Sequence, residues 1–305
     1  MRIVPLETHS RKKGRNMYNN FEELLKYCTA NACPISEAVM RNEERLTGRT
    51  RDEIMDNLRD MYSVMSAEAE KALDKPLSAG FSLIAGQAST QNAYAKAGDT
   101  ICGDMINRLM ARALSCSETN AAMGRICAAP TAGSCGIVPA VIITLSEQLG
   151  ADEEKTLRAL AAASGVGAVV IHNATVAGAE GGCQAECGVA AAMAAAGAVE
   201  MKGGTPAQAL DAAAFALKNV MGLVCDPVAG LVQVPCALRN ASQAVNALLS
   251  ADLALGGMKS LIPLDEVVEA MYNVGHMLPT QLRETALGGI AATPTGVSVR
   301  VNMHK

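Results

Sequence analysis

Aromatic residues are scarce in this sequence of 305 residues: they make up 3% of the chain and tryptophan is absent, although half of the residues are hydrophobic. This scarcity argues against base-stacking platforms, which depend on aromatic side chains. An excess of positive charge is also lacking, because 26 Lys and Arg residues stand against 30 Asp and Glu residues, a formal balance of −4. A nucleic-acid binder needs a basic face or stripe, so we expect no nucleic-acid partner.

Long apolar segments are missing as well. No apolar run of signal-peptide length follows the basic N-terminal stretch. The longest small-apolar stretches, residues 161–171 and 188–199, fall short of the roughly 20 residues that a membrane helix needs, so they are interpreted as buried helices. We therefore expect a cytoplasmic protein with no membrane partner. Residues 1–17 are predicted to be a disordered extension, because amphipathic patterning begins only at Asn20.

No alternating apolar and polar run of convincing length predicts a β-strand, whereas helix signals are frequent. A capping box at Thr50 to Glu53 precedes apolar residues at steps of three and four. Further helix starts and ends follow from capping residues and glycines. The predicted starts are Asp152, Thr205 and Asp265, and the predicted ends are Gly150, Gly256 and Gly275.

These patterns predict an all-α fold: one compact helical domain over residues 18–305, whose Gly/Pro-rich loops converge on a buried centre. Abundant Ala and Gly allow helices to approach closely around such a centre. One domain is the simplest account, and a boundary near Ala79 to Gly86 is the alternative.

Ten cysteines are the unusual feature of a chain that is long enough to bury a core without disulfide bonds. Cys183, Cys225 and Cys236 lie in Gly/Pro-rich turns, and they are much farther apart in sequence than the cysteines of structural zinc sites or ferredoxins. Three thiolates on an iron–sulfur cluster would leave one iron open as a Lewis acid for a hydroxyl leaving group. The pattern thus predicts dehydration rather than electron transfer, with unconnected core cysteines as the alternative.

The other cysteines have weaker signals. Cys187 follows Cys183 by four residues, and it would close the site if it were a fourth ligand. The roles of Cys187 and Cys135 stay open at this point. The remaining five are interpreted as ordinary core or surface residues: Cys28, Cys33, Cys102, Cys116 and Cys127.

A loop over residues 130–136 runs into a predicted helix over residues 137–149. Free backbone N–H groups at a helix start, together with the hydroxyls of Thr131 and Ser134, form a site for a carboxylate. The alternative is a helix N-cap in a tight turn.

Four motifs in order resemble the α chain of bacterial iron–sulfur-dependent L-serine dehydratase, and the similarity extends from about Asn20 to Gly296. They are APTAGS at 129–134, GAEGGCQAE at 178–186, CDPVAGLV with VPC within 225–236, and LRET leading to TPTG within 282–296. The resemblance implies a [4Fe-4S] cluster on Cys183, Cys225 and Cys236, conversion of L-serine to pyruvate and ammonia, and a separate β chain in the two-chain type. We also expect an oligomer.

One segment departs from this family. Where the family commonly reads Thr-Gly-Gly-Asp-Ala followed by Lys, this chain has Gln87 and, shortly after it, Thr90. An acid and a base are thus replaced by neutral residues. The departure leaves L-cysteine, with sulfide as the leaving group, as an alternative substrate. L-Threonine is another possible substrate. An electron-transfer or non-catalytic iron–sulfur subunit is a further alternative.

The candidate site residues follow from these motifs. We expect His172, Glu186 or Asp226 to be the base that removes the Cα proton of the substrate. Of these residue types, histidine has an ordinary pKa suited to this role. Each candidate also has a structural interpretation. His172 can be a structural histidine, Glu186 and Asp226 can orient the ligands, and Asp226 can be a turn residue before Pro227. The candidate substrate-binding residues are Thr131, Ser134, Asn173 and Arg283, and Arg283 is suited to pair with a carboxylate unless it forms an exposed ion pair instead.

Overall fold

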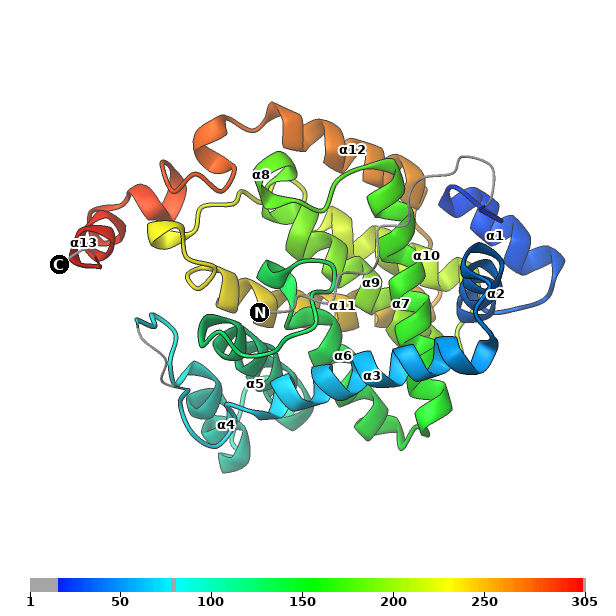
Figure 1. Cartoon of the computed structure of the whole chain (residues 1–305), viewed down its shortest axis with the longest axis horizontal. Coiled ribbons are helices and arrows are strands. Elements are labelled where there is room, and N and C mark those ends of the chain that lie inside the picture. Colours follow the sequence, from blue (N-terminus) through cyan, green and yellow to red (C-terminus); the bar gives the residue numbers. More distant parts are fainter. Residues whose placement is uncertain (1–15, 78–80, 304–305) are drawn as a thin grey trace.

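The computed structural model describes residues 16–77 and 81–303 (Figure 1). Within these residues the chain forms thirteen α-helices joined by loops and short turns, and it contains no β-strand. One isolated β-bridge pairs Cys225 with Arg283. The all-α prediction is therefore confirmed.

The helices follow one another along the chain, and the longer connections contain short helical turns. Their bounds are α1 (Phe21–Ala30), α2 (Ile35–Thr47), α3 (Arg51–Glu70), α4 (Gln87–Ala97), α5 (Gly103–Ala121), α6 (Ile137–Leu149), α7 (Glu153–Asn173), α8 (Gly178–Gly181), α9 (Val189–Met201), α10 (Pro206–Lys218), α11 (Cys236–Leu255), α12 (Leu264–Met277) and α13 (Pro294–Asn302). Between them lie a π-helical turn, η2 (Gln184–Gly188), and four 3-10 turns, η1 (Ala132–Ser134), η3 (Val228–Gly230), η4 (Thr280–Leu282) and η5 (Gly289–Ala292).

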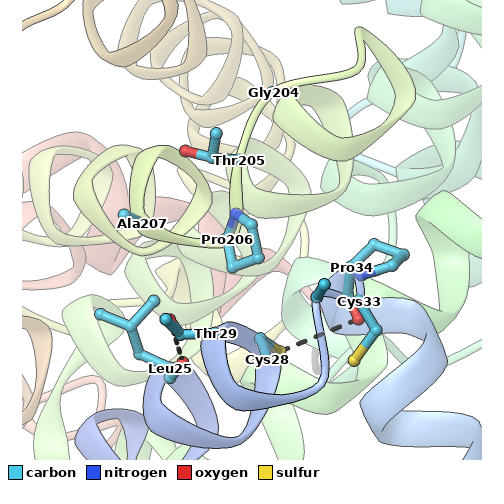
Figure 2. A pocket seen from close by; sticks show the side chains of 10 residues that line it. Leu25, Cys28, Thr29, Cys33, Pro34, Gly204, Thr205, Pro206 and Ala207 are labelled. Carbon is cyan, nitrogen blue, oxygen red and sulfur yellow. Dashed lines mark hydrogen bonds between the residues drawn. The ribbon is translucent and has the colours of Figure 1, made fainter.

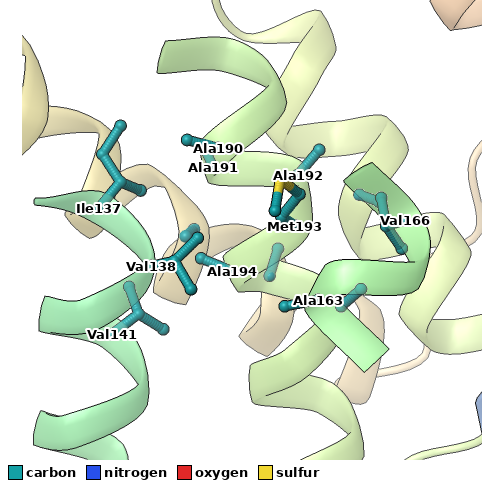
Figure 3. Packing of buried hydrophobic residues seen from close by; sticks show 14 of the residues in the cluster. Ile137, Val138, Val141, Ala163, Val166, Ala190, Ala191, Ala192, Met193 and Ala194 are labelled. Carbon is teal, nitrogen blue, oxygen red and sulfur yellow. The ribbon is translucent and has the colours of Figure 1, made fainter. Parts of the chain in front are cut away.

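The core is built around α9, whose sequence is mostly alanine and whose residues are nearly all buried. It packs against α6, α7, α10 and α11. Figure 3 shows its alanines between Ile137, Val138 and Val141 of α6 and Ala163 and Val166 of α7. A Cβ on Gly197 would lie 2.7 Å from the carbonyl oxygen of Ala159 on α7. Small side chains therefore let the helices approach closely, and both predicted buried helices lie in this core.

Most predicted helix boundaries are confirmed. Thr50, Asp152 and Thr205 are N-caps, and two of them form capping boxes with Glu53 and Gln208. The predicted helix ends at Gly150 and Gly256 are C-caps. These features depend on residues within one helical turn, so the local sequence is sufficient to predict them.

Two boundary predictions are wrong. Asp265 is not the N-cap of α12, which begins at Leu264; its carboxylate instead accepts the backbone N–H groups of Phe21 and Glu22 at the start of α1, each at 2.9 Å. Gly275 does not end α12, which continues to Met277. A Cβ there would lie 2.7 Å from the Cα of Gly181, so this glycine permits α12 to pack against α8.

The N-terminal extension predicted for residues 1–17 lies outside the described residues except for its last two. Of these, Met17 donates its backbone N–H to Oδ1 of Asn42 at 2.9 Å. The alternative domain boundary likewise begins in a segment, residues 78–80, that lies outside the described residues.

One described segment, Ala132–Leu149, is long and apolar enough to cross a membrane by length and composition. Of this segment, 72% is buried within the protein, so it belongs to the core of the fold.

Candidate active site

Cys183 lies at the sharp turn between α8 and the π-helical turn η2. The preceding Gly182 has a φ of +75°, and a Cβ there would lie 2.8 Å from the carbonyl oxygen of Leu223 and 2.7 Å from Cδ1 of Leu278. Only glycine fits this conformation and this space. The turn directs the thiol of Cys183 into the interior, where 1% of the residue is exposed, and π turns are frequent at functional sites.

The amide side chain of Gln184 fixes this turn to the segment that leads to the next cysteine. Its Nε2 donates to the carbonyl oxygens of Gly181 at 2.9 Å and Met271 at 3.2 Å. Its Oε1 accepts the N–H of Gly222 at 2.8 Å. Sequence reasoning missed this residue, because all of its hydrogen-bonding capacity is used by backbone groups that only the fold brings together.

Cys225 is held by the C-terminal part of the chain. Its N–H donates to the carbonyl oxygen of Leu282 at 2.8 Å, and its own carbonyl oxygen accepts the N–H of Glu284 at 2.7 Å. The motif at residues 282–296 therefore begins beside a candidate ligand.

Cys236 is the first residue of α11. One turn later, Asn240 donates from Nδ2 to the carbonyl oxygens of Cys236 at 2.9 Å and Gly133 at 2.7 Å, and its Oδ1 accepts the N–H of Gly136 at 2.8 Å. Asn240 thus joins the start of α11 to the loop at residues 130–136. It was also missed, since an asparagine inside a helix has no distinctive sequence signal.

The side chains of Cys183, Glu186 and Cys225 converge, and their ligand atoms all lie within 4.8 Å of one another. The sulfur of Cys187 lies 3.6 Å from that of Cys183. Cys236 is buried nearby, and its pKa is raised to about 12 by burial and then by the charge of Cys183. The fold thereby brings together segments that are far apart in sequence and forms a group able to hold a metal.

The donor set fits an iron–sulfur cluster in its chemistry. Buried thiols from three separate segments are soft ligands of the kind that such clusters use. The surroundings are also shaped for close approach, because a Cβ on Gly178 would lie 3.0 Å from the sulfur of Cys225 and 2.6 Å from Oε2 of Glu186.

Glu186 is the carboxylate of this group. Its Oε1 accepts a hydrogen bond from the hydroxyl of Thr131 at 2.9 Å, and its Oε2 lies 3.8 Å from the sulfur of Cys225. Burial, and then the charge of Cys183, raise the pKa of Glu186 to about 7. Such a carboxyl group is suited to accept and release a proton near neutral pH.

The hydroxyls of Thr131 and Ser134 are used within the protein. The two oxygen atoms lie 3.1 Å apart, and Ser134 also donates to the carbonyl oxygen of Thr131 at 3.4 Å. With the N–H of Gly136 held by Asn240, this geometry favours the N-cap interpretation of the loop over a carboxylate site. Thr131 reaches the candidate site through its contact with Glu186.

Both carboxylate oxygens of Asp226 are occupied. Its Oδ1 accepts a hydrogen bond from Nη2 of Arg239 at 2.8 Å, and its Oδ2 accepts the N–H of Ile290 at 2.7 Å. The structure therefore places Asp226 beside Cys225 in a buried ion pair.

The remaining candidates lie in different surroundings. His172 is exposed at the end of α7, and its side chain forms no hydrogen bond or ion pair with another described residue. The amide of Asn173 donates to the carbonyl oxygens of Asn19 at 2.7 Å and Val169 at 3.0 Å. Neither residue has a contact with the cysteine group within the described part of the chain.

Arg283 does lie at the site, because its backbone pairs with Cys225. Its Nη2 donates only a long bond of 3.4 Å to the hydroxyl of Thr280. Its Nε is buried and has no hydrogen-bond partner among the described residues. A buried donor without a partner is costly, so this guanidinium has capacity for an anionic ligand.

The segment that departs from the family lies against the Cys236 segment. The N–H of Leu83 donates to Oε1 of Gln233 at 2.6 Å, three residues before Cys236. Buried Glu118 accepts the N–H groups of Gly86 and Ala88, which fixes the start of α4. The segment that contains Gln87 is thus joined to the Cys236 segment through Leu83 and Gln233.

Other cysteines lie apart from this group. Cys28 and Cys33 line a surface pocket of about 390 Å³ between the end of α1 and the start of α10 (Figure 2). The N–H of Cys33 donates to the carbonyl oxygen of Cys28 at 3.0 Å, which closes the C-terminal end of α1. Cys135 and Cys116 are buried in a small satellite core under Tyr62. These positions suit the interpretation of such cysteines as packing residues.

Comparisons with known proteins agree with the motifs. A family described as serine dehydratase alpha chain matches residues 30–291. The "Probable L-serine dehydratase, alpha chain" of Bacillus subtilis is 46% identical over 92% of this chain and 93% of that protein. The "L-serine dehydratase, alpha chain" of Peptoniphilus asaccharolyticus is 47% identical over 95% of this chain and 99% of that protein. The "L-serine dehydratase TdcG" of Escherichia coli is 39% identical over 90% of this chain, but the match covers only 61% of that longer protein.

Proposed function

Because the chain belongs to the serine dehydratase alpha chain family, we propose that it catalyses the conversion of L-serine to pyruvate and ammonia. The observation that carries this proposal is the convergence of Cys183, Cys225 and Glu186 in one buried group. Serine loses the elements of water to give aminoacrylate, which tautomerises and is hydrolysed to pyruvate and ammonia. Such a reaction serves amino-acid catabolism and gluconeogenesis.

The cofactor in this proposal is a [4Fe-4S] cluster held by Cys183, Cys225 and Cys236. When bound, it would supply a Lewis acid able to polarise the hydroxyl group of serine. Cys187 is assigned no ligand role here. The protein's own residues bind the substrate and move its protons.

Arg283 binds the carboxylate of serine in this scheme. Its buried Nε lacks a partner among the described residues, and its backbone is paired with Cys225. A guanidinium can hold a carboxylate through two parallel hydrogen bonds, which would orient serine with its hydroxyl toward the cysteine group.

Glu186 accepts the Cα proton through Oε2. It is the carboxylate whose oxygen lies within 4.8 Å of the sulfurs of both Cys183 and Cys225. The hydroxyl of Thr131 holds the other oxygen, so Oε2 stays directed toward the site. Both oxygens of Asp226 are already occupied and His172 is exposed, which favours Glu186 over these two.

We further propose that the protein works with a β chain as part of an oligomer in the cytoplasm. The relatives named as alpha chains support a partner. The longer Escherichia coli relatives, of which this chain covers about three fifths, suggest that further sequence accompanies the catalytic part.

The deciding experiment combines iron and sulfide analysis with pyruvate formation in anaerobically purified protein. We expect a cluster whose absorption and electron paramagnetic resonance spectra change on addition of L-serine, with turnover of L-serine. Separate replacement of Cys183, Cys225 and Cys236 by Ser should abolish the cluster, whereas Cys187→Ser is the matched control and should retain it. Turnover of L-cysteine alone, or a cluster insensitive to both serine and oxygen, would contradict the proposal.

The role of Glu186 has its own test. Glu186→Gln keeps the shape of the side chain but removes the base, so it should retain iron and lose roughly 100- to 10,000-fold in turnover. Exchange of the Cα hydrogen of serine with deuterated water should be lost in parallel. A variant that still exchanges this hydrogen at the wild-type rate would exclude Glu186 as the base.

A further inference from the structure

Arg239 occupies a central position between the three candidate cysteine segments. It lies on α11, three residues after Cys236, so the two side chains share one face of the helix. Its side chain is 14% exposed. A buried guanidinium must find partners for its N–H groups, and the partners of Arg239 all belong to the other two segments.

The first set of partners flanks Cys225 on both sides. Nη1 of Arg239 donates to the carbonyl oxygen of Val224 at 2.8 Å, and Nη2 donates to Oδ1 of Asp226 at 2.8 Å. The planar guanidinium thus holds the residues immediately before and after the cysteine. This double contact fixes the direction in which the thiol of Cys225 leaves the backbone.

The second partner is Cys183. After the contacts of Cys183 with Cys187 and Cys225, the positive charge of the guanidinium also contributes to a lowered pKa of the Cys183 thiol. Arg239 therefore donates hydrogen bonds to the Cys225 segment and acts on Cys183 through its charge, while it is itself anchored one turn from Cys236. Gln184 and Asn240 each join some of these segments, whereas Arg239 acts on all three through its hydrogen bonds, its charge and its place on α11.

Asp226 extends the network to the C-terminal part of the chain. Its second oxygen accepts the N–H of Ile290, and a Cβ on the adjacent Gly289 would lie 2.2 Å from that oxygen. Because Gly289 has a φ of +58°, the chain can turn here around the carboxylate. The turn η5 is thereby tied to the ion pair.

A buried ion pair of this kind contributes little stability compared with apolar residues of similar size. Its presence is better explained by the order that it imposes on the segments around it. A role in positioning also explains where the hydrogen bonds of this ion pair end. Those of Arg239 end on the two neighbours of Cys225, and the second oxygen of Asp226 binds the C-terminal turn.

We propose that Arg239 is a positioning residue that holds the Cys183, Cys225 and Cys236 segments in the arrangement that accepts the cluster, and that its positive charge raises the reduction potential of that cluster. The effect on the reduction potential rests on the proposed function, because it requires the cluster. The positioning of the three cysteine segments does not require it.

The first experiment needs no cluster. In the full-length apo-protein, the reaction of each thiol with N-ethylmaleimide is followed by peptide mass spectrometry. Exposed Cys102 should react at once, whereas Cys183 and Cys225 should be protected. In Arg239→Gln these two thiols should react at least about tenfold faster, because an unpaired buried Asp226 loosens their segments. Buried Cys116 should stay protected, which excludes global unfolding as the cause.

Arg112 provides the matched control. It is another arginine held in ion pairs, here with Glu70 and Glu147, but it lies on α5. Arg112→Gln should lower stability without selective reaction of Cys183 and Cys225. Unchanged protection of both thiols in Arg239→Gln, or equal selective reaction in Arg112→Gln, would overturn the positioning role.

The second experiment measures the midpoint potential of the reconstituted cluster under anaerobic conditions. Arg239→Gln should lower the potential, because loss of a nearby positive charge disfavours the reduced form. Arg239→Lys keeps the positive charge, so the potential should stay close to wild type. The thiols of Cys183 and Cys225 should nevertheless become reactive, since an ammonium group cannot reproduce the planar array of N–H donors of a guanidinium. Equal potentials in wild type and Arg239→Gln would overturn the electrostatic part. If wild-type protein assembles no cluster, the proposed cofactor fails, and the maleimide experiment still decides the positioning role.

Discussion

The hydroxyl of Thr131 donates a hydrogen bond to Oε1 of Glu186 at 2.9 Å, across 55 residues of sequence. This contact joins the loop before α6 to the π-helical turn that carries the candidate base. It gives the loop a role in orienting a carboxylate of the protein rather than in binding that of a ligand.

Removal of this hydroxyl should therefore lower catalysis more than stability. Thr131→Val should reduce turnover of L-serine by roughly 10- to 100-fold, which corresponds to a hydrogen bond to a charged group of about 1.5–3 kcal/mol. Thr131→Ser keeps the donor and should stay close to wild type. Pyruvate formation and iron content are measured together; loss of iron in Thr131→Val would assign the residue to cluster assembly instead.

Two glycines around Glu186 should respond differently to a methyl group. A Cβ on Gly178 would approach both Glu186 and the sulfur of Cys225, whereas one on Gly133 would lie 2.9 Å from Oε1 of Glu186. Gly178→Ala should lower both iron content and turnover. Gly133→Ala should lower turnover and keep the iron. The same loss of iron in both variants would show that the two glycines do not act separately.

Stability should depend on pH through Glu68. This carboxyl on α3 is 1% exposed, its Oε2 accepts the N–H of Cys127 at 3.3 Å, and its Oε1 has no partner among the described residues. Burial raises the pKa of Glu68 to about 9 from an ordinary value of 4.5. Between these two values the folded state keeps a proton that the unfolded state releases, so this group makes the free energy of unfolding fall as pH rises.

Glu68→Gln should remove this dependence, because the amide resembles the protonated acid. The variant should exceed wild type by about 2 kcal/mol at pH 7 and by less near pH 5. Urea denaturation at several pH values measures this difference. Exposed Glu266 is the control, and Glu266→Gln should follow the wild-type pH profile. Parallel profiles for Glu68→Gln and wild type would contradict the raised pKa.

The contact between Asp265 and α1 should contribute to stability. Asp265→Ala leaves the N–H groups of Phe21 and Glu22 without their carboxylate partner. The free energy of unfolding should fall by about 2 kcal/mol. Asp252→Ala, at an exposed position on α11, should change it by less than about 0.5 kcal/mol. Equal effects of the two substitutions would exclude a specific role for the Asp265 contact.

Sequence reasoning succeeded where the physical signal is local. The capping residues at Thr50, Asp152 and Thr205 act on N–H groups within one turn, so their meaning can be recognised without the fold. The same reasoning failed at Asp265, because an acidic residue near a helix start can cap a different helix that is distant in sequence.

The candidate site shows the same division. Cys183, Cys225 and Cys236 were recognised as a set because they lie in Gly/Pro-rich turns and because the surrounding motifs resemble a family. Arg239 and Gln184 were missed, since neither residue has a local pattern and their partners are backbone or side-chain groups far along the chain.

The sequence by itself determined the helical class and most helix boundaries, because periodicity and capping act over a few residues. The tertiary structure decided which groups meet. It brought the Glu186 carboxylate beside the sulfurs of Cys183 and Cys225 and left His172 exposed. It also used Asp226 in an ion pair, because burial of a charge requires a partner that only the packed helices supply.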